Sequence, residues 1–388
     1  MNRGCKTFGF VAFLALLTAG PAFTQTPSTE ETRETAGAES SSSSVAYVYV
    51  SRPTHIDGFV VATDGKLTPV PGSPFPDISV SHMSVNKKYL FGLGDDHQHI
   101  YTFSIASNGA LKQVAANVPD SFVSGPINID FTGSTLYDAN MDSDSFIQSY
   151  KIEENGTLQF LGETPSDSTF DIQEVAPTMI NFIGTNQYAY QTGCDEDALN
   201  PATEKFKREP SGEVKFVSGV FALPKPPDSG DVYCPYQLAT DPTDHLAVAV
   251  QDWNENEGEP VGLIALAAFT ADSDGNLTTH STYENMPSID TGYVNTMSIS
   301  PTGKLLVVGG AGFQVFHFNG SNPVTSFTRL LQANDQFLEF GWDSHNRLYA
   351  LSVGTLRVYT VTPTSITEAS GSPYSIPEAS SVVVLSPQ

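Results

Sequence analysis

Basic residues are scarce in this sequence. It contains 18 Lys and Arg against 43 Asp and Glu, which gives a formal net charge of −25. Phosphate contacts need clustered positive charge, so this balance excludes nucleic acid and anionic membrane surfaces as partners. It favours cations and basic partners, or it serves only to keep the chain in solution.

Long apolar runs are missing after the first residues, and no later segment reaches the roughly 18 apolar residues that a membrane helix needs. No membrane span is therefore predicted. The start of the chain has basic Arg3 and Lys6 followed by a short apolar run over residues 8–19. This layout is typical of a secretory signal peptide. We predict a signal peptide over residues 1–24 and a secreted, periplasmic or extracellular protein.

Residues 25–44 contain no aromatic and no large aliphatic side chain. Such a stretch cannot bury enough surface to offset its ordering entropy, so we predict a disordered spacer rich in Ser, Thr and Glu. The rest of the chain, residues 45–388, carries the fold.

A strand-turn-strand phrase recurs in this part of the chain, and long helical patterns are missing from it. The turns are Ser84–Lys88, Asp130–Ser134, Ile183–Gln187, Asp241–His245, Ser300–Lys304 and Asp343–Arg347. The first apolar positions after them recur every 43 to 59 residues, which is the period of a four-stranded propeller blade.

A second series of tight turns runs alongside the first. Its members are Asp64-Gly65, Asn108-Gly109, Asn155-Gly156, Ser211-Gly212, Asp274-Gly275, Asn319-Gly320 and Thr364-Ser365. Most of these dipeptides accept the positive φ angles of hairpins, and each precedes a short apolar run. Seven hairpins against six complete first turns indicate that one blade is split between the two ends of the chain.

These patterns predict an all-β protein, a seven-bladed β-propeller of four-stranded antiparallel blades. The blades are assigned to residues 45–76 with 380–388, then 77–119, 120–166, 167–224, 225–287, 288–334 and 335–379. The C-terminal strand, Ser381–Pro387, should join the N-terminal blade and close the ring, which removes exposed sheet edges. A single monomeric propeller is expected.

Four loops between second and third strands are acidic, and the topology places them on one face. They contain Asp95-Asp96-His97-Gln98-His99, Asp142-Ser143-Asp144, Cys194-Asp195-Glu196-Asp197 and Asp252-Trp253-Asn254-Glu255. Clustered carboxylates could supply oxygen ligands to Ca²⁺, for which Asp142, Asp144 and Asp195 are candidates. His97 and His99 could instead bind a transition metal with Asp95. Solvated loops without any ligand are the alternative.

The same topology brings Cys194 and Cys234 to adjacent blades on this face. In an oxidising compartment a disulfide between them is expected, with two free thiols as the alternative. Strand positions nearest the ring axis, equivalent to Ser298, are His82, Asn128, Asn181, Ala239, Gly341 and Val384. No pair of them forms a catalytic dyad.

The blade phrases, such as ISPTGKLLVVGG at Ile299–Gly310 and the run Ala46–Phe75, resemble the lactonase-like propellers with YVTN-type repeats. That family includes 6-phosphogluconolactonase and muconate-lactonizing types, so the resemblance implies a lactonase scaffold. The family's H-P-H motif falls on Val123-Ser124-Gly125, and its D-L-G-x-D motif falls on Asn140–Asp144, where only the last aspartate is kept. The family's usual catalytic residues are therefore missing.

Two functions follow. The first is a non-catalytic module that presents its acidic face to a cation, a carbohydrate or a protein. The second is a lactone hydrolase with a rearranged site, for which Asp144, His97 and Arg52 are the candidate catalytic residues. Phosphorylated lactones are disfavoured, because they need cationic anchors that this chain lacks.

Overall fold

The computed structural model describes residues 45–119, 123, 125–140, 146–165, 179–195, 200–219, 223–254 and 259–386, without the side chains at 140, 194, 195, 200–202 and 259. Every regular element in these ranges is a β-strand, so the described chain holds no helix that could cross a membrane. The predicted signal peptide and spacer lie outside these ranges.

Thirty strands follow one another in the part of the chain that the structure describes. They are β1 (Ala46–Arg52), β2 (His55–Val61), β3 (Leu67–Pro69), β4 (Phe75–Pro76), β5 (Val80–Val85), β6 (Tyr89–Gly94), β7 (Ile100–Ile105), β8 (Leu111–Asn117), β9 (Ile127–Ile129), β10 (Thr135–Asn140), β11 (Phe146–Ile152), β12 (Leu158–Pro165), β13 (Asn181–Phe182), β14 (Tyr188–Asp195), β15 (Asn200–Arg208), β16 (Val214–Ser218), β17 (Asp231–Thr240), β18 (His245–Asn254), β19 (Glu259–Pro260), β20 (Ala265–Ala271), β21 (Leu277–Thr279), β22 (Thr296–Ile299), β23 (Leu305–Asn319), β24 (Asn322–Ser326), β25 (Leu331–Trp342), β26 (Arg347–Ser352), β27 (Thr355–Thr362), β28 (Ser365–Glu368), β29 (Tyr374–Ser375) and β30 (Ser381–Leu385).

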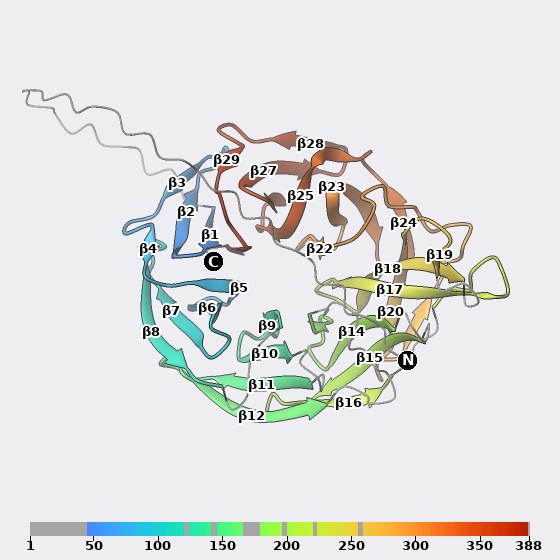
Figure 1. Ribbon diagram of the computed structural model, residues 1–388, viewed down its shortest axis with the longest axis horizontal. Coiled ribbons are helices and arrows are strands. Elements are labelled where there is room, and N and C mark those ends of the chain that lie inside the picture. Colours follow the sequence, from blue (N-terminus) through green and yellow to red (C-terminus); the bar gives the residue numbers. More distant parts are fainter. Residues whose placement is uncertain are drawn as a thin grey trace, which may run out of the picture. The chain divides into compact units, whose positions relative to one another are not determined.

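The strands form antiparallel blades in chain order. Blades 2, 3 and 4 are β5–β8, β9–β12 and β13–β16, and blade 5 is β17, β18, β20 and β21 with β19 beside β18. Blades 6 and 7 begin at β22 and within β25. The predicted all-β architecture and its blade order are confirmed, and Figure 1 shows the blades following one another around a common centre.

Blade 1 combines both ends of the described chain. Its order is β3-β2-β1-β30, and β30 pairs with β1 from Tyr47↔Leu385 to Ser51↔Ser381. Figure 1 shows the C-terminal end beside β1. The predicted joining of the last strand to the N-terminal blade is therefore confirmed.

Blades 6 and 7 share one sheet, which differs from the predicted boundary at residue 335. The first half of β25 pairs with β23 at Phe313↔Leu331 and Ala311↔Gln336, and its second half pairs with β26 as the inner strand of blade 7. β23 turns back on itself near Ala311, and the backbone groups at this turn pair with the first half of β25. The chain therefore stays extended as it passes from blade 6 to blade 7.

A separate apolar cluster fills each of the seven junctions between neighbouring blades in the described chain. One cluster joins Val48 and Val50 of β1 to Tyr349 and Leu351 of β26, so blade 7 packs directly on blade 1. Inner strands also meet around the ring, since β30 contacts both β25 and β5. Burial between blades, in addition to pairing within them, therefore holds the ring closed.

One inter-blade hydrogen bond is repeated three times. The buried hydroxyls of Tyr49, Tyr137 and Tyr190 donate to the carbonyl oxygens of Gly109, Gly212 and Gly275, at 2.9, 2.6 and 2.7 Å. Each glycine lies in the hairpin turn of the next blade and has a positive φ, between 72° and 102°. The predicted hairpin glycines thus also serve as docking points for the preceding blade.

Candidate functional site

The loop of blade 2 carries three of the predicted metal ligands. Asp95 accepts a hydrogen bond from Ser79, the ring of His97 lies 3.0 Å from the carbonyl oxygen of Val123, and His99 Nδ1 lies 2.6 Å from Asp96 Oδ2. His97 has a φ of 53°, so it sits in a turn and does not alternate with His99 along a strand. Each of the three side chains therefore has a separate partner, and only that of His99 lies in the same loop.

No group of three or more His, Cys, Asp or Glu within the described ranges is arranged to hold a metal ion. Asp142 and Asp144 lie outside those ranges, as does the side chain of Asp195. Metal binding by these loops, and a catalytic role for Asp144 or His97, therefore stay predictions.

Arg52, the third catalytic candidate, ends β1 at the turn into β2. Its Nε donates to the carbonyl oxygen of Pro377 at 3.0 Å, and its Nη1 lies 3.5 Å from Asp57 Oδ2. His55 Nε2 lies 3.6 Å from the other oxygen of Asp57. These contacts tie the loop of blade 1 to the segment that leads into β30, and a catalytic role for Arg52 stays a prediction.

Cys234 is fully buried in β17. β17 packs against β14, the strand that carries Cys194, so the two cysteines lie on adjacent blades as expected. The side chain of Cys194 is outside the description, and the disulfide stays a prediction.

Acidic groups do gather at the loop of blade 5. Asp252 is 8 % exposed, and its Oδ1 has no hydrogen-bond partner within the described chain. Burial raises the pKa of Asp252 to about 6, and the nearby carboxylates of Asp231 and Asp228 add to the rise. This part of the face therefore favours a positive charge nearby.

A channel runs along the ring axis and is lined by all seven blades. One part of the channel, called the upper part, has a volume of about 360 Å³. It is lined by Ser380 before β30, His82 of β5, Pro126 before β9, Asn181 of β13, Gln237 of β17, Thr296 of β22 and Glu339 of β25. Its lower part, about 330 Å³, is bounded by Ser84, Ser298, Gly341 and Val384 among others. Four residues line both parts: His82, Pro126, Met179 and Glu339. The stretch of the channel that these four residues line is called the waist.

Glu339 is the acidic group at this waist. Burial raises the pKa of Glu339 to about 7, although hydrogen bonds from Ser381 and from the Val382 amide favour the charged form. The hydrogen bond from the backbone amide of Val382 to Glu339 Oε2 is short, at 2.6 Å. Glu339 is partly exposed and lines the channel, and a carboxyl group with a raised pKa in a cavity is a candidate acid or base.

His82 is the second titratable group at the waist. His82 is accessible to solvent from the channel, but the protein that surrounds it disfavours the charged imidazolium and lowers the pKa of His82; the Asp95 carboxylate opposes this shift and His97 adds to it. A neutral imidazole carries one N–H donor and one acceptor nitrogen. The waist thus brings a carboxyl group with a raised pKa and an imidazole with a lowered pKa to the lining of one stretch of channel, where they can serve as a base and a hydrogen-bond donor.

Sequence comparison of equivalent strand positions identified His82 but missed Glu339. The strand positions compared with Ser298 included Gly341. Glu339 lies two residues earlier on β25 and is therefore on the same face of the strand. Extending the comparison by one step of the two-residue period would have placed Glu339 on the axis. Thr296 and Gln237 occupy the corresponding places on β22 and β17.

The channel carries no positive charge among its described lining residues, which include neither Lys nor Arg. A further depression, about 580 Å³, lies between blades 2 and 3, but its lining includes neither Glu339 nor His82. The channel is therefore the better candidate for chemistry, and its chemistry suits uncharged molecules.

Solved structures with the same fold include lactonases. A periplasmic gluconolactonase of Pseudomonas aeruginosa aligns with a TM-score of 0.64 at 14% identity, over 88% of this chain and 99% of that one. A Bacteroides uniformis protein, provisionally assigned as a 6-phosphogluconolactonase, aligns with a TM-score of 0.58 at 13% identity, over 88% and 100%. A Desulfotomaculum acetoxidans protein of unknown function aligns with a TM-score of 0.59 at 14% identity, over 89% and 100%.

No protein-family model and no curated protein matches the sequence. Identities this low show a common fold and leave activity to be argued from the site. The chain has the fold of the lactonase-like propellers.

Proposed function

We propose that this protein hydrolyses an uncharged lactone in its central channel, with Glu339 as the general base. The observation that carries the proposal is the presence of both Glu339 and His82 in the lining that the two halves of the channel share. The gluconolactonase and the provisional 6-phosphogluconolactonase with this fold support the substrate class.

The reaction needs one base and one donor. Ionised Glu339 takes a proton from water, and the resulting hydroxide attacks the carbonyl carbon of the lactone. The N–H of neutral His82 donates to the carbonyl oxygen as negative charge develops there. When the ring C–O bond breaks, Glu339 returns the proton to the leaving oxygen, which gives a hydroxy acid and regenerates the carboxylate.

Glu339→Gln tests this role. The amide keeps the shape of the side chain but cannot accept the proton, so kcat/KM for δ-gluconolactone should fall by about 10² to 10⁴ after subtraction of spontaneous hydrolysis. The wild-type rate should decline as the pH falls below about 7, because Glu339 becomes protonated there.

Ser298→Ala is the matched control, since Ser298 lines the lower channel without a titratable group. It should leave kcat/KM within about threefold of wild type. A Glu339→Gln enzyme as active as the wild type would overturn the assignment. If neither wild type nor variant hydrolyses any lactone, the proposed activity is wrong.

A second candidate function is the binding of a cation, a carbohydrate or a protein by the acidic loop face. It is favoured by the repulsion among Asp228, Asp231 and Asp252, which a positive charge would relieve. A ligand that binds only the folded state raises Tm. An unchanged Tm in millimolar Ca²⁺ would remove the Ca²⁺ form of this proposal.

The proposed setting is outside the cytoplasm. The basic start and short apolar run of residues 1–24 support export, and residues 25–44 would then link the mature N-terminus to a monomeric propeller. N-terminal sequencing of protein recovered from the producing cell's exterior tests this, because retention of Met1 would exclude cleavage.

A further inference from the structure

One backbone hydrogen bond marks equivalent positions in successive blades. It runs from the last residue of each third strand to the carbonyl group just before the second strand. In blade 3 it joins Ile152 N to Ser134 O at 2.9 Å, and in blade 4 it joins Arg208 N to Gln187 O at 2.8 Å. Ile152 and Arg208 therefore occupy the same place in neighbouring blades.

Arg208 closes the junction between blades 3 and 4. Its Nη2 lies 2.9 Å from Asp130 Oδ2 and donates to Thr135 Oγ1 at 3.1 Å. Asp130 is 3 % exposed and belongs to the first turn of blade 3. The arginine thus reaches across the junction and fills it with a buried ion pair.

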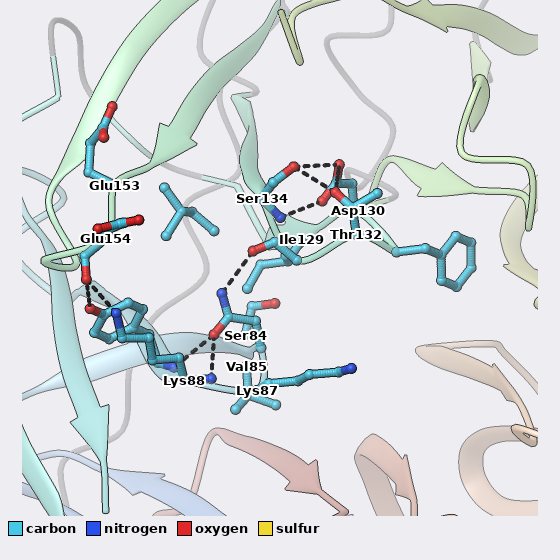
Figure 2. Close-up of a pocket in the computed structure, with 15 residues that line it drawn as sticks. Ser84, Val85, Lys87, Lys88, Ile129, Asp130, Thr132, Ser134, Glu153 and Glu154 are labelled. Atoms are coloured by element: carbon cyan, nitrogen blue, oxygen red, sulfur yellow. Dashed lines mark hydrogen bonds between the residues drawn. The ribbon is translucent and has the colours of Figure 1, made fainter. Parts of the chain in front are cut away.

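The junction between blades 2 and 3 lacks both members of this pair. Ile152 stands in the place of Arg208, and Asn86 stands in the place of Asp130. The equivalence of Asn86 and Asp130 follows from their turns, in which Asn86 N donates to Tyr89 O at 2.9 Å and Asp130 N donates to Thr135 O at 3.1 Å. A depression of about 580 Å³ remains here, and Figure 2 shows three turns approaching it from different sides.

The wall of this depression is mainly apolar. Val85, Ile129 and Ile152 contribute aliphatic side chains, and the ring of Tyr89 adds an aromatic surface beneath Lys88, whose Nζ lies 4.9 Å from the ring centre. A site of this size and lining accepts the body of a small ligand.

The charges at the rim do not cancel. Asp130 is neutralised by Arg208, and Glu153 by Lys151 at 2.7 Å. Lys87, Lys88 and Glu154 remain, which leaves a local excess of one positive charge in a chain of net charge −25. Lys88 Nζ donates to the carbonyl oxygen of Glu154 at 2.5 Å. Lys87 has no ion-pair partner within the described ranges and lies along the edge of the depression in Figure 2.

We propose that this inter-blade depression is a second binding site, for an apolar-bodied monoanion such as an aromatic carboxylate. The apolar wall takes the body of the ligand, and the Lys87 edge takes its carboxylate. The site opens between first and last turns of the blades, on the face opposite to the acidic loops. It is a different site from the channel waist, although Ser84 and Val85 line both it and the lower channel.

The test is calorimetric titration of the full chain with 1-naphthoate. One molecule should bind per chain with a Kd below about 1 mM, and uncharged 1-naphthamide should bind about threefold to tenfold more weakly because it loses the contact with Lys87. Lys87→Glu should weaken naphthoate binding about tenfold. Lys87 is exposed, so this variant should fold as the wild type does.

The matched occluding variant is Asn86→Asp with Ile152→Arg, which copies the ion pair of the next junction into this one. It should abolish naphthoate binding while leaving lactone hydrolysis unchanged. Ile152→Leu keeps the lining apolar and should bind as the wild type does. Absence of binding to the wild type, or unchanged affinity in both Lys87→Glu and the occluding variant, overturns the proposal.

Discussion

Asp138 is a carboxyl group that the fold removes completely from water. It lies on β10 opposite Gln148 and Ile127, it is 0 % exposed, and neither of its carboxylate oxygens has a hydrogen-bond partner in the described chain. Burial raises the pKa of Asp138 from its ordinary 3.8 to about 8, and the nearby Gly125 amide, which does not reach good hydrogen-bond geometry, offsets only part of this rise. At neutral pH the folded protein therefore holds Asp138 in its neutral form.

This shift makes stability depend on pH. The unfolded chain releases the proton of Asp138 near its ordinary pKa of 3.8, whereas the folded chain keeps it up to a pKa of about 8. Between these two values the folded state binds more protons, so its stability is greatest at low pH and falls as the pH rises. The loss is about 1.4 kcal/mol per pH unit, and about 6 kcal/mol over the whole window as an upper bound. That is a large part of the ~5 to 15 kcal/mol that stabilises a typical domain.

Asp138→Asn removes the titration and keeps the shape of the side chain. We expect the free energy of unfolding of the wild type to fall between about pH 5 and pH 7 by about 3 kcal/mol more than that of the variant. Urea unfolding followed by circular dichroism at several pH values measures this difference. Asp274→Asn makes the same chemical change on an exposed turn and should keep the wild-type slope.

Equal pH slopes for the wild type and Asp138→Asn would refute the reasoning, because they would show that Asp138 titrates alike in both states. A constant offset between the two proteins would instead report a change in packing. Only the difference in slope measures the pKa shift.

Three further predictions concern the ring. Tyr137→Phe should lower the free energy of unfolding by about 1 to 2 kcal/mol, because Gly212 O loses its buried donor; Tyr190→Phe removes the equivalent bond and should cost the same, and no change in either would contradict a role for these bonds. Truncation after Ala379 removes β30 and should abolish the cooperative unfolding transition, whereas a truncation that removes only Pro387 and Gln388 should not; a folded protein without β30 would show that closure of blade 1 is dispensable. Intact mass under non-reducing conditions should be lower by two hydrogens than after reduction if Cys194 and Cys234 are bonded, and alkylation of both thiols without reductant would exclude the disulfide.

Turn chemistry made most of the fold predictable. Asn155-Gly156 and Asp274-Gly275 need backbone angles that few residues accept, and both glycines have the positive φ that their turns require. Because such signals are local, they located the blades and the split first blade. They could not locate the end of blade 6, where β25 runs on from one blade to the next without a turn.

The candidate site was harder to predict because its residues are far apart in sequence. Comparison of strand positions brought His82 to the axis, but Glu339 lies one step earlier on its strand and carries no motif of its own. The altered pKa values of both side chains arise mainly from the protein that surrounds them, which disfavours their charged forms. The sequence around Glu339 does not show that the folded protein partly buries this side chain.

The sequence by itself determined the repeat, the number of blades and the return of the last strand, since hairpins and alternating strands depend on residues a few positions apart. Tertiary structure alone decided what the repeats enclose. It placed Glu339 and His82 in the lining of the same stretch of channel, and it left a depression at the junction where Ile152 occupies the position of Arg208 in the next blade. Such features depend on contacts between blades, where burial and charge are set by residues that the chain brings together only when the ring closes.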